Sequence, residues 1–331
     1  MCEQVPMVSI IVPMYNERNT IDACLRSFAR QRWPLQRLEL IVVDGGSTDG
    51  SRELVDEWVR NHNWVRLVEN PDRKAAAAFN RGVSAATGEV ICLFSAHGEA
   101  DPSYVEASVR ALRDSGAAGV GGRYLNEGTE PVSRAIGLAM MSPFGMASPH
   151  RYAQRRMEVD TISHPAYRSE ALAEVGPFDE TLERNSDYDL NFRVRQRGMR
   201  LVFDPSIVSV YRPRRSLTAL ARQFWWYGRW KARVVERHPR SLRPRHLAPP
   251  AFVVGAVASA PIARHPLGRR VVLTAYGSYV ALLACAALRA KPWRHNASTV
   301  AFVVALPVMH FSWGAGFVRS LLGDLVRGQR R

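Results

Sequence analysis

Along the first 120 residues, short runs of apolar and β-branched residues alternate with longer stretches in which apolar and polar residues are mixed. The apolar runs, which predict strands, are residues 8–13, 38–43, 64–68 and 89–94. The mixed stretches, which predict helices, are residues 19–30, 50–62, 74–86 and 102–115. Because the runs lack polar alternation, they are typical of strands buried on both faces. We therefore expect an α/β domain with a parallel sheet, which binds ligands at the carboxyl ends of its strands.

The pattern changes near residue 240, where an Arg- and Pro-rich stretch over residues 239–250 predicts a linker. Three apolar stretches follow, at residues 248–263, 271–288 and 297–318. Only the last two approach the roughly 20 residues that are needed to cross a bilayer. We expect a catalytic domain over residues 1–240 and a basic, apolar, membrane-associated helical region over residues 241–331. The alternative is that these segments are buried helices of a soluble domain.

The net charge of +15 is concentrated at one end of the chain. Residues 1–205 carry 24 Lys and Arg against 28 Asp and Glu, whereas residues 206–331 carry 21 against 2. A basic segment can bind nucleic acid or anionic lipid, and the interleaved apolar stretches favour lipid. Every connector between these stretches is basic, so three alternating spans cannot satisfy the positive-inside rule. A first segment lying in the interface, followed by a hairpin or re-entrant pair, reduces this conflict.

No charged region followed by an apolar stretch opens the chain, so no signal peptide is visible. The four cysteines show no paired spacing, which is consistent with a reducing compartment. Both observations favour a cytoplasmic position for the first residues.

Candidate chemistry follows the first two predicted strands, in the segments PMYNE and VVDGGSTDG. Asp44 lies at a strand tip, where its carboxylate can accept hydrogen bonds from a base or a ribose. Gly45 and Gly46 allow a backbone to approach a ligand closely. Taken alone, however, Asp-Gly-Gly is equally an ordinary turn.

Four segments in order, VSIIVPMYNE, IVVDGGSTDG, NPDRKAAAAFNRG and GEVICLF, resemble the donor half of family 2 glycosyltransferases. The later segments SAHGEADPSYVE, SDYDLNFRVRQRG, QFWWYGRWK and HFSWGAGFVRSLL are similar to the succinoglycan glucosyltransferase (ExoA-like) type, so the resemblance covers nearly the whole chain. It implies a GT-A fold and transfer of a sugar from a nucleoside diphosphate, usually UDP, with inversion. It also implies a set of donor-binding residues, namely Pro13, Tyr15, Glu17, Asp44, Arg73, Asn80, Ser95 and His97. Arg73 alone would instead be taken for a solvated surface charge.

The family's Asp-x-Asp metal motif is replaced here by Ser95, Ala96 and His97. A hydroxyl and an imidazole make a weaker site for Mg²⁺ or Mn²⁺ than two carboxylates, and Mn²⁺ tolerates histidine better. His97 is therefore a candidate metal ligand, and use of a divalent metal is left open. Glu99 or Asp101 can supply a carboxylate, although Asp101 fits a helix cap equally well.

If no metal binds, cationic side chains must stabilise the leaving diphosphate, and Arg229 and Lys231 are candidates. The family's Gln-x-x-Arg-Trp motif is matched loosely by Gln223, Arg229 and Trp230, with too wide a gap. We assign these residues to an acceptor or diphosphate site. The same aromatic-rich segment equally suits an amphipathic helix at a membrane interface.

The family's second acidic motif, Glu-Asp, reads Ser186 and Asp187 here. Inverting transfer needs one base to take the proton of the acceptor hydroxyl, and Asp187 is the candidate. Its alternative role is that of an acid at a helix N-terminus, and both roles can hold together. We expect Asp189 to be structural, Asp160 to be a possible donor or acceptor contact, and His164 to have no catalytic role.

The resemblance thus implies an inverting hexosyltransferase for exopolysaccharide or other cell-envelope glycans. It would use a nucleotide sugar and a lipid-linked or polysaccharide acceptor at the cytoplasmic face of the cell membrane, with no nucleic-acid partner. The main rival is a catalytically silent donor-binding or scaffolding relative, suggested by serine in both acidic motifs. A processive synthase fits less well, because the chain lacks a bundle of long spans. A nucleotide-dependent oxidoreductase fits less well, because no Gly-x-Gly-x-x-Gly turn follows a strand. A nucleic-acid binder fits less well, because the basic excess lies with apolar segments.

Overall fold

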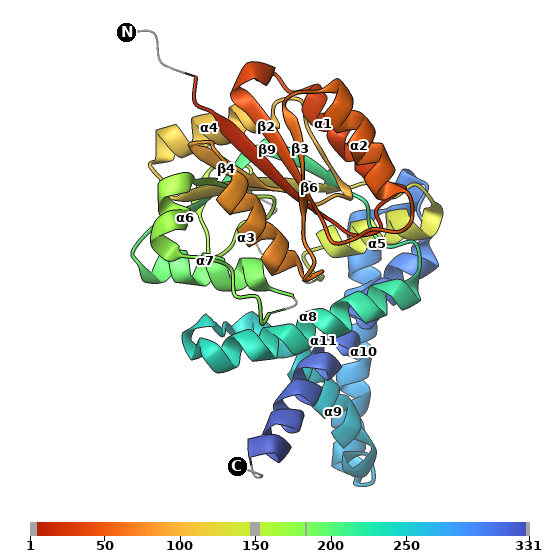
Figure 1. Cartoon of the computed structure of the whole chain (residues 1–331). Helices are drawn as coiled ribbons and strands as arrows, with labels where there is room; N and C mark the ends of the chain where they lie inside the picture. The colour runs from red at the N-terminus through yellow and green to blue at the C-terminus, as the bar shows by residue number, and fades with distance from the viewer. Residues whose placement is uncertain (1–4, 146–152, 183, 329–331) are drawn as a thin grey trace. The chain divides into compact units, whose positions relative to one another are not determined.

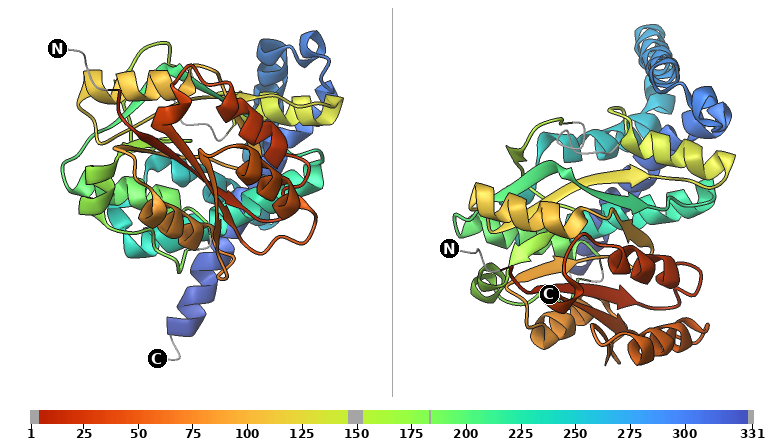
Figure 2. Two further views of the ribbon diagram at one scale, coloured as in Figure 1. Left: turned by 45° about the horizontal axis from the view of Figure 1, so that its top comes forward. Right: turned by 90° about the horizontal axis from the view of Figure 1, so that it is seen from above.

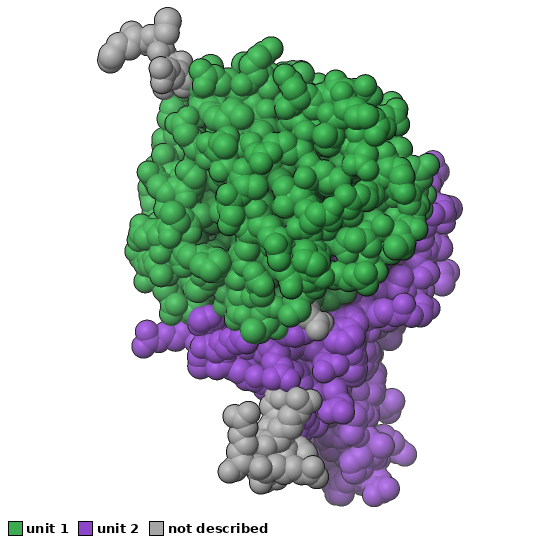
Figure 3. All heavy atoms as spheres, viewed as in Figure 1, with its two compact units in different colours: residues 1–125, 150–211 green, residues 126–149, 212–331 purple. Residues whose placement is uncertain are grey.

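The computed structural model describes residues 5–145, 153–182 and 184–328, with side chains described as far as residue 323. The chain divides into two compact units (Figure 3). Unit 1 comprises residues 1–125 and 150–211, and unit 2 comprises residues 126–149 and 212–331.

Unit 1 is built on a single mixed sheet (Figure 1). Within the described residues the sheet has nine strands, which are β1 (Val8–Met14), β2 (Leu38–Asp44), β3 (Val65–Glu69), β4 (Val90–Leu93), β5 (Gly98–Ala100), β6 (Gly119–Asn126), β7 (Met157–Glu158), β8 (Ala166–Arg168) and β9 (Leu201–Tyr211). They follow the order β3-β2-β1-β4-β8-β6-β9-β5, and β7 pairs with β9. The first four strands are parallel, whereas β8 joins β4 in the antiparallel direction.

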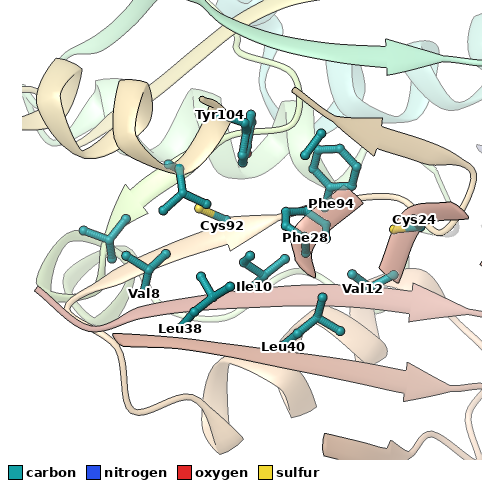
Figure 4. Close-up of a cluster of buried hydrophobic side chains, with 14 of the residues drawn as sticks. Val8, Ile10, Val12, Cys24, Phe28, Leu38, Leu40, Cys92, Phe94 and Tyr104 are labelled. Atoms are coloured by element: carbon teal, nitrogen blue, oxygen red, sulfur yellow. The ribbon is translucent and has the colours of Figure 1, made fainter. Parts of the chain in front are cut away.

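Helices cover both faces of this sheet, as the views in Figure 2 show. They are α1 (Ile21–Ala29), α2 (Ser51–Asn61), α3 (Ala75–Ala85), α4 (Tyr104–Ser115), α6 (Ser169–Val175) and α7 (Ser186–Gln196). Successive side chains of a strand point to opposite faces, so β1 and β2 feed two apolar layers. The layer beneath α1, α2 and α4 contains Val8, Ile10, Val12, Leu38 and Leu40 (Figure 4). The opposite layer, beneath α3, α6 and α7, contains Ile11, Ile41 and Val43.

The predicted α/β fold is confirmed, and the four expected strands and four expected helices of the first 120 residues all form. The antiparallel half was not predicted from the sequence. Its strands are short, as in β5, β7 and β8, or carry polar residues, as in β9. Their apolar periodicity is therefore too weak to identify them.

Apart from the last residue of β6, the regular secondary structure in the described residues of unit 2 is all helical. Its helices are α5 (Pro131–Met141), α8 (Leu217–Arg237), α9 (Ala248–Ile262), α10 (Pro266–Ala290) and α11 (Thr299–Gly328). Helix α8 therefore groups with the C-terminal helices, although the sequence placed it within residues 1–240. The proposed functional boundary at residue 240 stays a prediction.

The stretch over residues 239–250, expected to be a linker, is folded. Short 3₁₀ helices form at Pro239–Ser241 and Pro244–His246, Ser241 is buried, and α9 already begins at Ala248. The prolines occupy first turns of these helices, where a missing N–H costs nothing. The prediction of a linker was wrong because proline can begin a helix as well as interrupt one.

Helices α8 and α11 approach closely through glycines. A Cβ added at Gly228 would lie 2.0 Å from the carbonyl oxygen of Trp313, and one added at Gly316 would lie 2.2 Å from that of Trp225. Side chains at these two positions would force the backbones apart. Small residues at such contacts are typical of helices that pack in membranes.

Two helices of unit 2 are long and apolar enough to cross a membrane, over residues Pro266–His295 and Thr299–Gly323. This agrees with the expectation that only the last two apolar stretches approach spanning length. This finding rests on the length and composition of the helices, which a buried core helix of a soluble protein can share. In the apolar 18-residue stretch of each helix, 50% is buried in Thr299–Gly323 but only 17% in Pro266–His295.

Glu39 of β2 is a buried acid whose hydrogen bonds stabilise the native state. Its carboxylate accepts hydrogen bonds from Ser9 Oγ and from the N–H and Oγ of Thr87, and it forms an ion pair with Arg66 at 3.3 Å. Burial raises the pKa of Glu39. The hydrogen bonds and the charge of Arg66 together lower it by more, so the pKa lies below its usual value. The resulting stability is present above pH 4.5, the ordinary value, and is lost as the pH falls through the lowered pKa.

We predict that Glu39→Gln lowers the free energy of unfolding by about 2 kcal/mol near neutral pH, the scale of charge-assisted hydrogen bonds. The variant should also lose part of the acid dependence below pH 4.5. Denaturant unfolding of both proteins in detergent between pH 3 and 7 measures this. The control is Glu106→Gln. It removes the charge of an exposed acid whose carboxylate lies 4.0 Å from the guanidinium of Arg110, and the variant should match the wild type. Equal stability of Glu39→Gln and wild type across the range would refute the assignment.

Candidate active site at the carboxyl edge of the parallel strands

The candidate site lies where β1, β2 and β4 end. In the register of the sheet, Met14 of β1 is opposite Asp44 of β2, and Asp44 is opposite Glu69 of β3. The order β3-β2-β1-β4 places β2 and β4 on opposite sides of β1. The connection from β1 to β2 therefore runs to one side of β1, and the connection from β3 to β4 crosses to the other side. Such a switch point opens a crevice at the carboxyl ends of the strands, which is where doubly wound sheets bind ligands.

The loops after β1 and β2 are fastened to each other by hydrogen bonds from backbone N–H groups to side-chain oxygens. Asn16 has a left-handed backbone, with φ of 55°. Its N–H donates to Ser47 Oγ at 2.9 Å, and its Oδ1 accepts from the N–H of Thr48 at 2.9 Å. One residue further, the N–H of Glu17 donates to Ser51 Oγ at 2.8 Å. These bonds fix the two loops as a single rigid edge, which the sequence did not reveal.

Asp44 is fully buried, and its oxygens are engaged within unit 1. Ser47 Oγ donates to Asp44 Oδ1 at 2.6 Å, and the guanidinium of Arg52 lies 3.6 Å from Oδ2. Arg52 also pairs with the exposed Glu69, and this hydrogen bond lowers the pKa of the Glu69 carboxyl. The buried carboxylate thus orders the turn that carries Gly45 and Gly46.

An aromatic ring and a guanidinium meet on the exposed side of this edge. Tyr15 is 47% exposed, and the guanidinium carbon of Arg73 lies 5.8 Å from the centre of its ring. Arg73 has a left-handed backbone with φ of 56°, which is costly for a residue other than glycine. The sequence-predicted residues Tyr15 and Arg73 are therefore brought together, although 58 positions separate them in the chain.

Glu17 and His97 meet across the switch point. Glu17 follows β1 and His97 follows β4, and His97 Nδ1 lies 3.2 Å from Glu17 Oε1. Both side chains are partly exposed, at 27% and 35%. Thr20 Oγ1 donates to the second oxygen of Glu17 at 2.7 Å, which orients the carboxylate.

Ser95, at the first position of the altered metal motif, does not join this pair. Its Oγ lies 2.7 Å from Nε2 of the buried His164. The thiol of Cys24 lies beneath the same turn and donates to the carbonyl oxygen of Ser95 at 3.7 Å. Burial, together with the charges of Glu99 and Glu17, raises the pKa of this thiol well above its usual value. Cys24 is consequently a packed thiol rather than a nucleophile.

The remaining donor-binding candidates have structural partners. Pro13 lies within β1 opposite Val43. The side-chain amide of Asn80 donates to the carbonyl oxygen of Phe178 at 3.0 Å, and its Oδ1 accepts from the N–H of Phe178 at 2.7 Å. A donor contact by Asn80 stays a prediction, since these bonds already tie α3 to the segment after α6.

Asp187 is exposed in the first turn of α7, where a carboxylate also favours the helix dipole. Asp189 is buried and forms an ion pair with Arg193 at 2.9 Å, in agreement with the structural role expected for it. Asp160 pairs with Arg195 at 3.3 Å. Burial and the charge of Asp187 raise the pKa of Tyr167, whose hydroxyl donates to Asn191.

The acceptor and diphosphate candidates belong to unit 2 and lie on α8. Gln223 is buried, accepts from Arg214 Nε at 3.2 Å and donates to the hydroxyl of Tyr227 at 2.8 Å. The guanidinium of Arg229 stacks over Trp226 at 4.9 Å. Lys231 is buried and donates to the carbonyl oxygen of Ser241 at 3.3 Å. The ammonium group of Lys231 is thus engaged within unit 2.

The indole N–H of Trp230 is buried and has no hydrogen-bond partner among the described residues. Its assignment to the acceptor or diphosphate site stays a prediction.

The side chains at the edge fit only one mode of metal binding. Among the described residues no group of three or more His, Cys, Asp or Glu side chains could hold an ion. Glu17 and His97 offer one carboxylate and one imidazole, whereas the hydroxyl of Ser95 is engaged by His164. Mg²⁺ is commonly bound by one or two protein carboxylates together with substrate phosphates. The pair therefore fits an ion that is bound jointly with a diphosphate.

A parallel half with this edge, continued by an antiparallel half, defines the GT-A class of nucleotide-sugar transferase folds. A solved structure of the same fold is mannosyltransferase PcManGT from Pyrobaculum calidifontis in complex with GDP-Man and Mn²⁺. It is 22% identical, covers 96% of this chain and 87% of its own, and superposes with a TM-score of 0.66.

The chain belongs to glycosyl transferase family 2, which matches residues 9–176. It is 30% identical to the succinoglycan biosynthesis protein ExoA of Rhizobium meliloti, over 95% of this chain and 94% of that protein. A second relative is dolichyl N-acetyl-α-D-glucosaminyl phosphate 3-β-D-2,3-diacetamido-2,3-dideoxy-β-D-glucuronosyltransferase of Methanococcus voltae. It is 28% identical over 70% of this chain and 74% of its own length. The predicted family is therefore confirmed.

We predict that Tyr15→Ala and Arg73→Ala each weaken binding of a nucleoside diphosphate about tenfold, since a base stacked on an aromatic ring is worth about 1–3 kcal/mol. Calorimetric titration with UDP and with GDP measures the effect. Arg81→Ala removes an exposed arginine that pairs with Asp72 at 2.7 Å, and it should leave affinity unchanged. Wild-type affinity in both variants would show that the nucleotide binds elsewhere.

Proposed function

We propose that this chain is an inverting glycosyltransferase that moves a sugar from a UDP sugar to a lipid-linked or polysaccharide acceptor in exopolysaccharide or other cell-surface glycan synthesis. One observation carries the proposal: the meeting of Glu17 and His97 at 3.2 Å across the switch point of the sheet. Side chains from the segments that follow β1 and β4 converge there on the crevice in which a nucleotide is expected.

The exposed side of the edge suits a nucleoside. The ring of Tyr15 and the guanidinium of Arg73 offer a flat surface for a base, and the fastened loops after β1 and β2 offer hydrogen-bonding groups for a ribose. Because Asp44 is buried, we propose that it supports donor binding by ordering the turn that carries Gly45 and Gly46. UDP follows from the family resemblance, and GDP is the alternative suggested by the GDP-mannose of the Pyrobaculum enzyme.

The pyrophosphate would lie towards Glu17 and His97. A divalent ion, Mn²⁺ or Mg²⁺, would supply positive charge that stabilises the leaving diphosphate. The residues that fit such an ion are His97 and Glu17, which would share it with the phosphate oxygens. The assignment of Arg229 to the diphosphate, made from the sequence, stays a prediction.

Asp187 would act as the general base. As the acceptor hydroxyl attacks the anomeric carbon, its proton passes to the Asp187 carboxylate, and the bond from that carbon to the diphosphate oxygen breaks. Attack from the face opposite the leaving group inverts the anomeric configuration. The exposure of Asp187 in the first turn of α7 is compatible with access by an acceptor.

Unit 2 would hold the enzyme at the cytoplasmic face of the cell membrane. Helix α10 exposes large apolar side chains to its surroundings, among them Leu267, Val271, Leu273, Val280 and Leu288. Arginines lie at both ends of this helix, together with Lys291 at its C-terminal end, where they can pair with lipid headgroups. The Methanococcus relative, whose name describes a dolichyl phosphate acceptor, supports a lipid-linked substrate.

We predict that Asp187→Asn lowers turnover by about 10²–10⁴-fold, the usual contribution of a positioned general base, while donor affinity is unchanged. The measurement is transfer and hydrolysis of a nucleotide-sugar panel by membrane-embedded protein with added lipid extract, with and without Mn²⁺ or Mg²⁺. Glu170→Gln, which alters an exposed acid on α6, is the control. Donor binding by the wild type without turnover under any condition would favour the silent, scaffolding relative instead.

We predict that Val280→Asp in α10 impairs membrane integration, because an aspartate near the centre of a spanning helix costs about 2.5–3.5 kcal/mol on insertion. Val280 is 64% exposed, so in a soluble protein the same change would be harmless. The fraction of chain that resists alkaline carbonate extraction measures integration. The control is Val59→Asp on α2 of unit 1, which should not alter extraction. If Val280→Asp resists extraction as the wild type does, α10 does not enter the bilayer.

A further inference from the structure

His164 lies in a strained and closely packed position next to the altered metal motif. It is 7% exposed, and its backbone has φ of 41°. It precedes Pro165, and a residue before proline is normally restricted to extended conformations. A positive φ there is strained and persists only when surrounding contacts enforce it.

Both ring nitrogens of His164 are engaged by serine hydroxyls. Nε2 lies 2.7 Å from Ser95 Oγ, and Nδ1 lies 2.9 Å from Ser209 Oγ. A hydroxyl can donate or accept, so a neutral imidazole satisfies both contacts in either tautomer. The ring stacks on Phe94 with centroids 3.9 Å apart, and the hydroxyl of Tyr104 donates to the backbone oxygen of His164 at 2.8 Å. The side chain therefore connects the end of β4 to β9.

The turn that carries His97 is built around this ring. The N–H of Gly98 donates to the carbonyl oxygen of Ser95 at 2.9 Å, which closes the turn. A Cβ at Gly98 would lie 2.8 Å from His164 Cε1 and 2.9 Å from Phe94 Cε1, so only glycine lets the turn close on the imidazole. Gly98 then pairs with Tyr211 of β9. Within this turn Ser95 contacts His164, whereas His97 contacts Glu17.

We propose that His164 is a positioning residue for His97. By holding Ser95 at one ring nitrogen and Ser209 at the other, it fixes the turn after β4 and presents the imidazole of His97 to Glu17. Position 95, which is an acid in the family motif, thereby supplies structure in place of a metal ligand. The inference rests on the proposed function for its link to the donor, but the placement of His97 can be tested without it.

The placement is tested by the rate at which diethyl pyrocarbonate modifies His97 in the full chain, followed by peptide mass spectrometry. Ser95→Ala and Ser209→Ala each break one end of the connection and should speed modification of His97 severalfold, because its contact with Glu17 is loosened. Ser206→Ala removes a hydroxyl that bonds only locally to Asp204 on β9, and it should leave the rate unchanged. Ser95→Thr, which keeps a hydroxyl, should restore the wild-type rate. Wild-type rates in both alanine variants would overturn the proposal.

The link to the donor is tested by titrating the same variants with UDP and GDP in the presence of Mn²⁺. Ser95→Ala and Ser209→Ala should weaken binding about tenfold, equivalent to about 1.4 kcal/mol, and Ser206→Ala should not. Faster modification of His97 with unchanged nucleotide affinity would show a merely structural connection and would overturn the positioning role. If the wild type binds no nucleotide, the proposed function fails, whereas faster modification of His97 would still support its placement by His164.

Discussion

Strand β1 imposes the constraint on which the candidate site depends. It is paired in parallel with β2 on one side and with β4 on the other, so the segments that follow these three strands must emerge at one edge. Residues that are far apart in the chain, such as Glu17 and His97, are thereby brought within 3.2 Å. The apolar layers on both faces of the sheet hold the strands in register. A one-residue slip of β1 would exchange its two buried faces and move Glu17 out of reach.

All three residues of the altered metal motif have defined surroundings in the structure. In the segment Ser95-Ala96-His97 the serine turns towards His164, the alanine is buried, and the histidine faces Glu17. A motif position that ordinarily supplies a ligand has thus been absorbed into the packing of the sheet. Serine is suited to this use, since its hydroxyl can both donate and accept whereas an ionised carboxylate can only accept. Loss of an acid from such a motif is accordingly weak evidence for loss of activity.

The parallel half of the fold could be predicted from the sequence because its strands are uninterrupted apolar runs with helices between them. The resemblance of PMYNE and VVDGGSTDG to family motifs located the edge, and the structure brings Tyr15 to Arg73 and Glu17 to His97. The antiparallel half was missed because its pairings are long-range and its strands short or polar.

The contacts of His164 and the burial of Lys231 could not be predicted for the same reason, since each depends on a partner that no local pattern specifies. The sequence indicates no catalytic role for His164, and its contact with Ser95 depends on the pairing of β4 with β8. Asn16 illustrates the same limit, because the fastening of its loop to Ser47 depends on the register of β1 and β2.

The glycine contact between α8 and α11 has a mechanical consequence. Where Gly228 and Gly316 bring the two backbones together, there is no layer of side chains that could yield as one helix moves along the other. The two helices therefore behave as one stiff body. In a bilayer, a tilt of α11 that accommodates a thicker or thinner hydrocarbon layer would be transmitted directly to α8 and to its row of aromatic and basic side chains. The lipid composition of the membrane would then act on the protein in two ways, through the tilt of α11 and through the affinity of basic side chains for lipid headgroups.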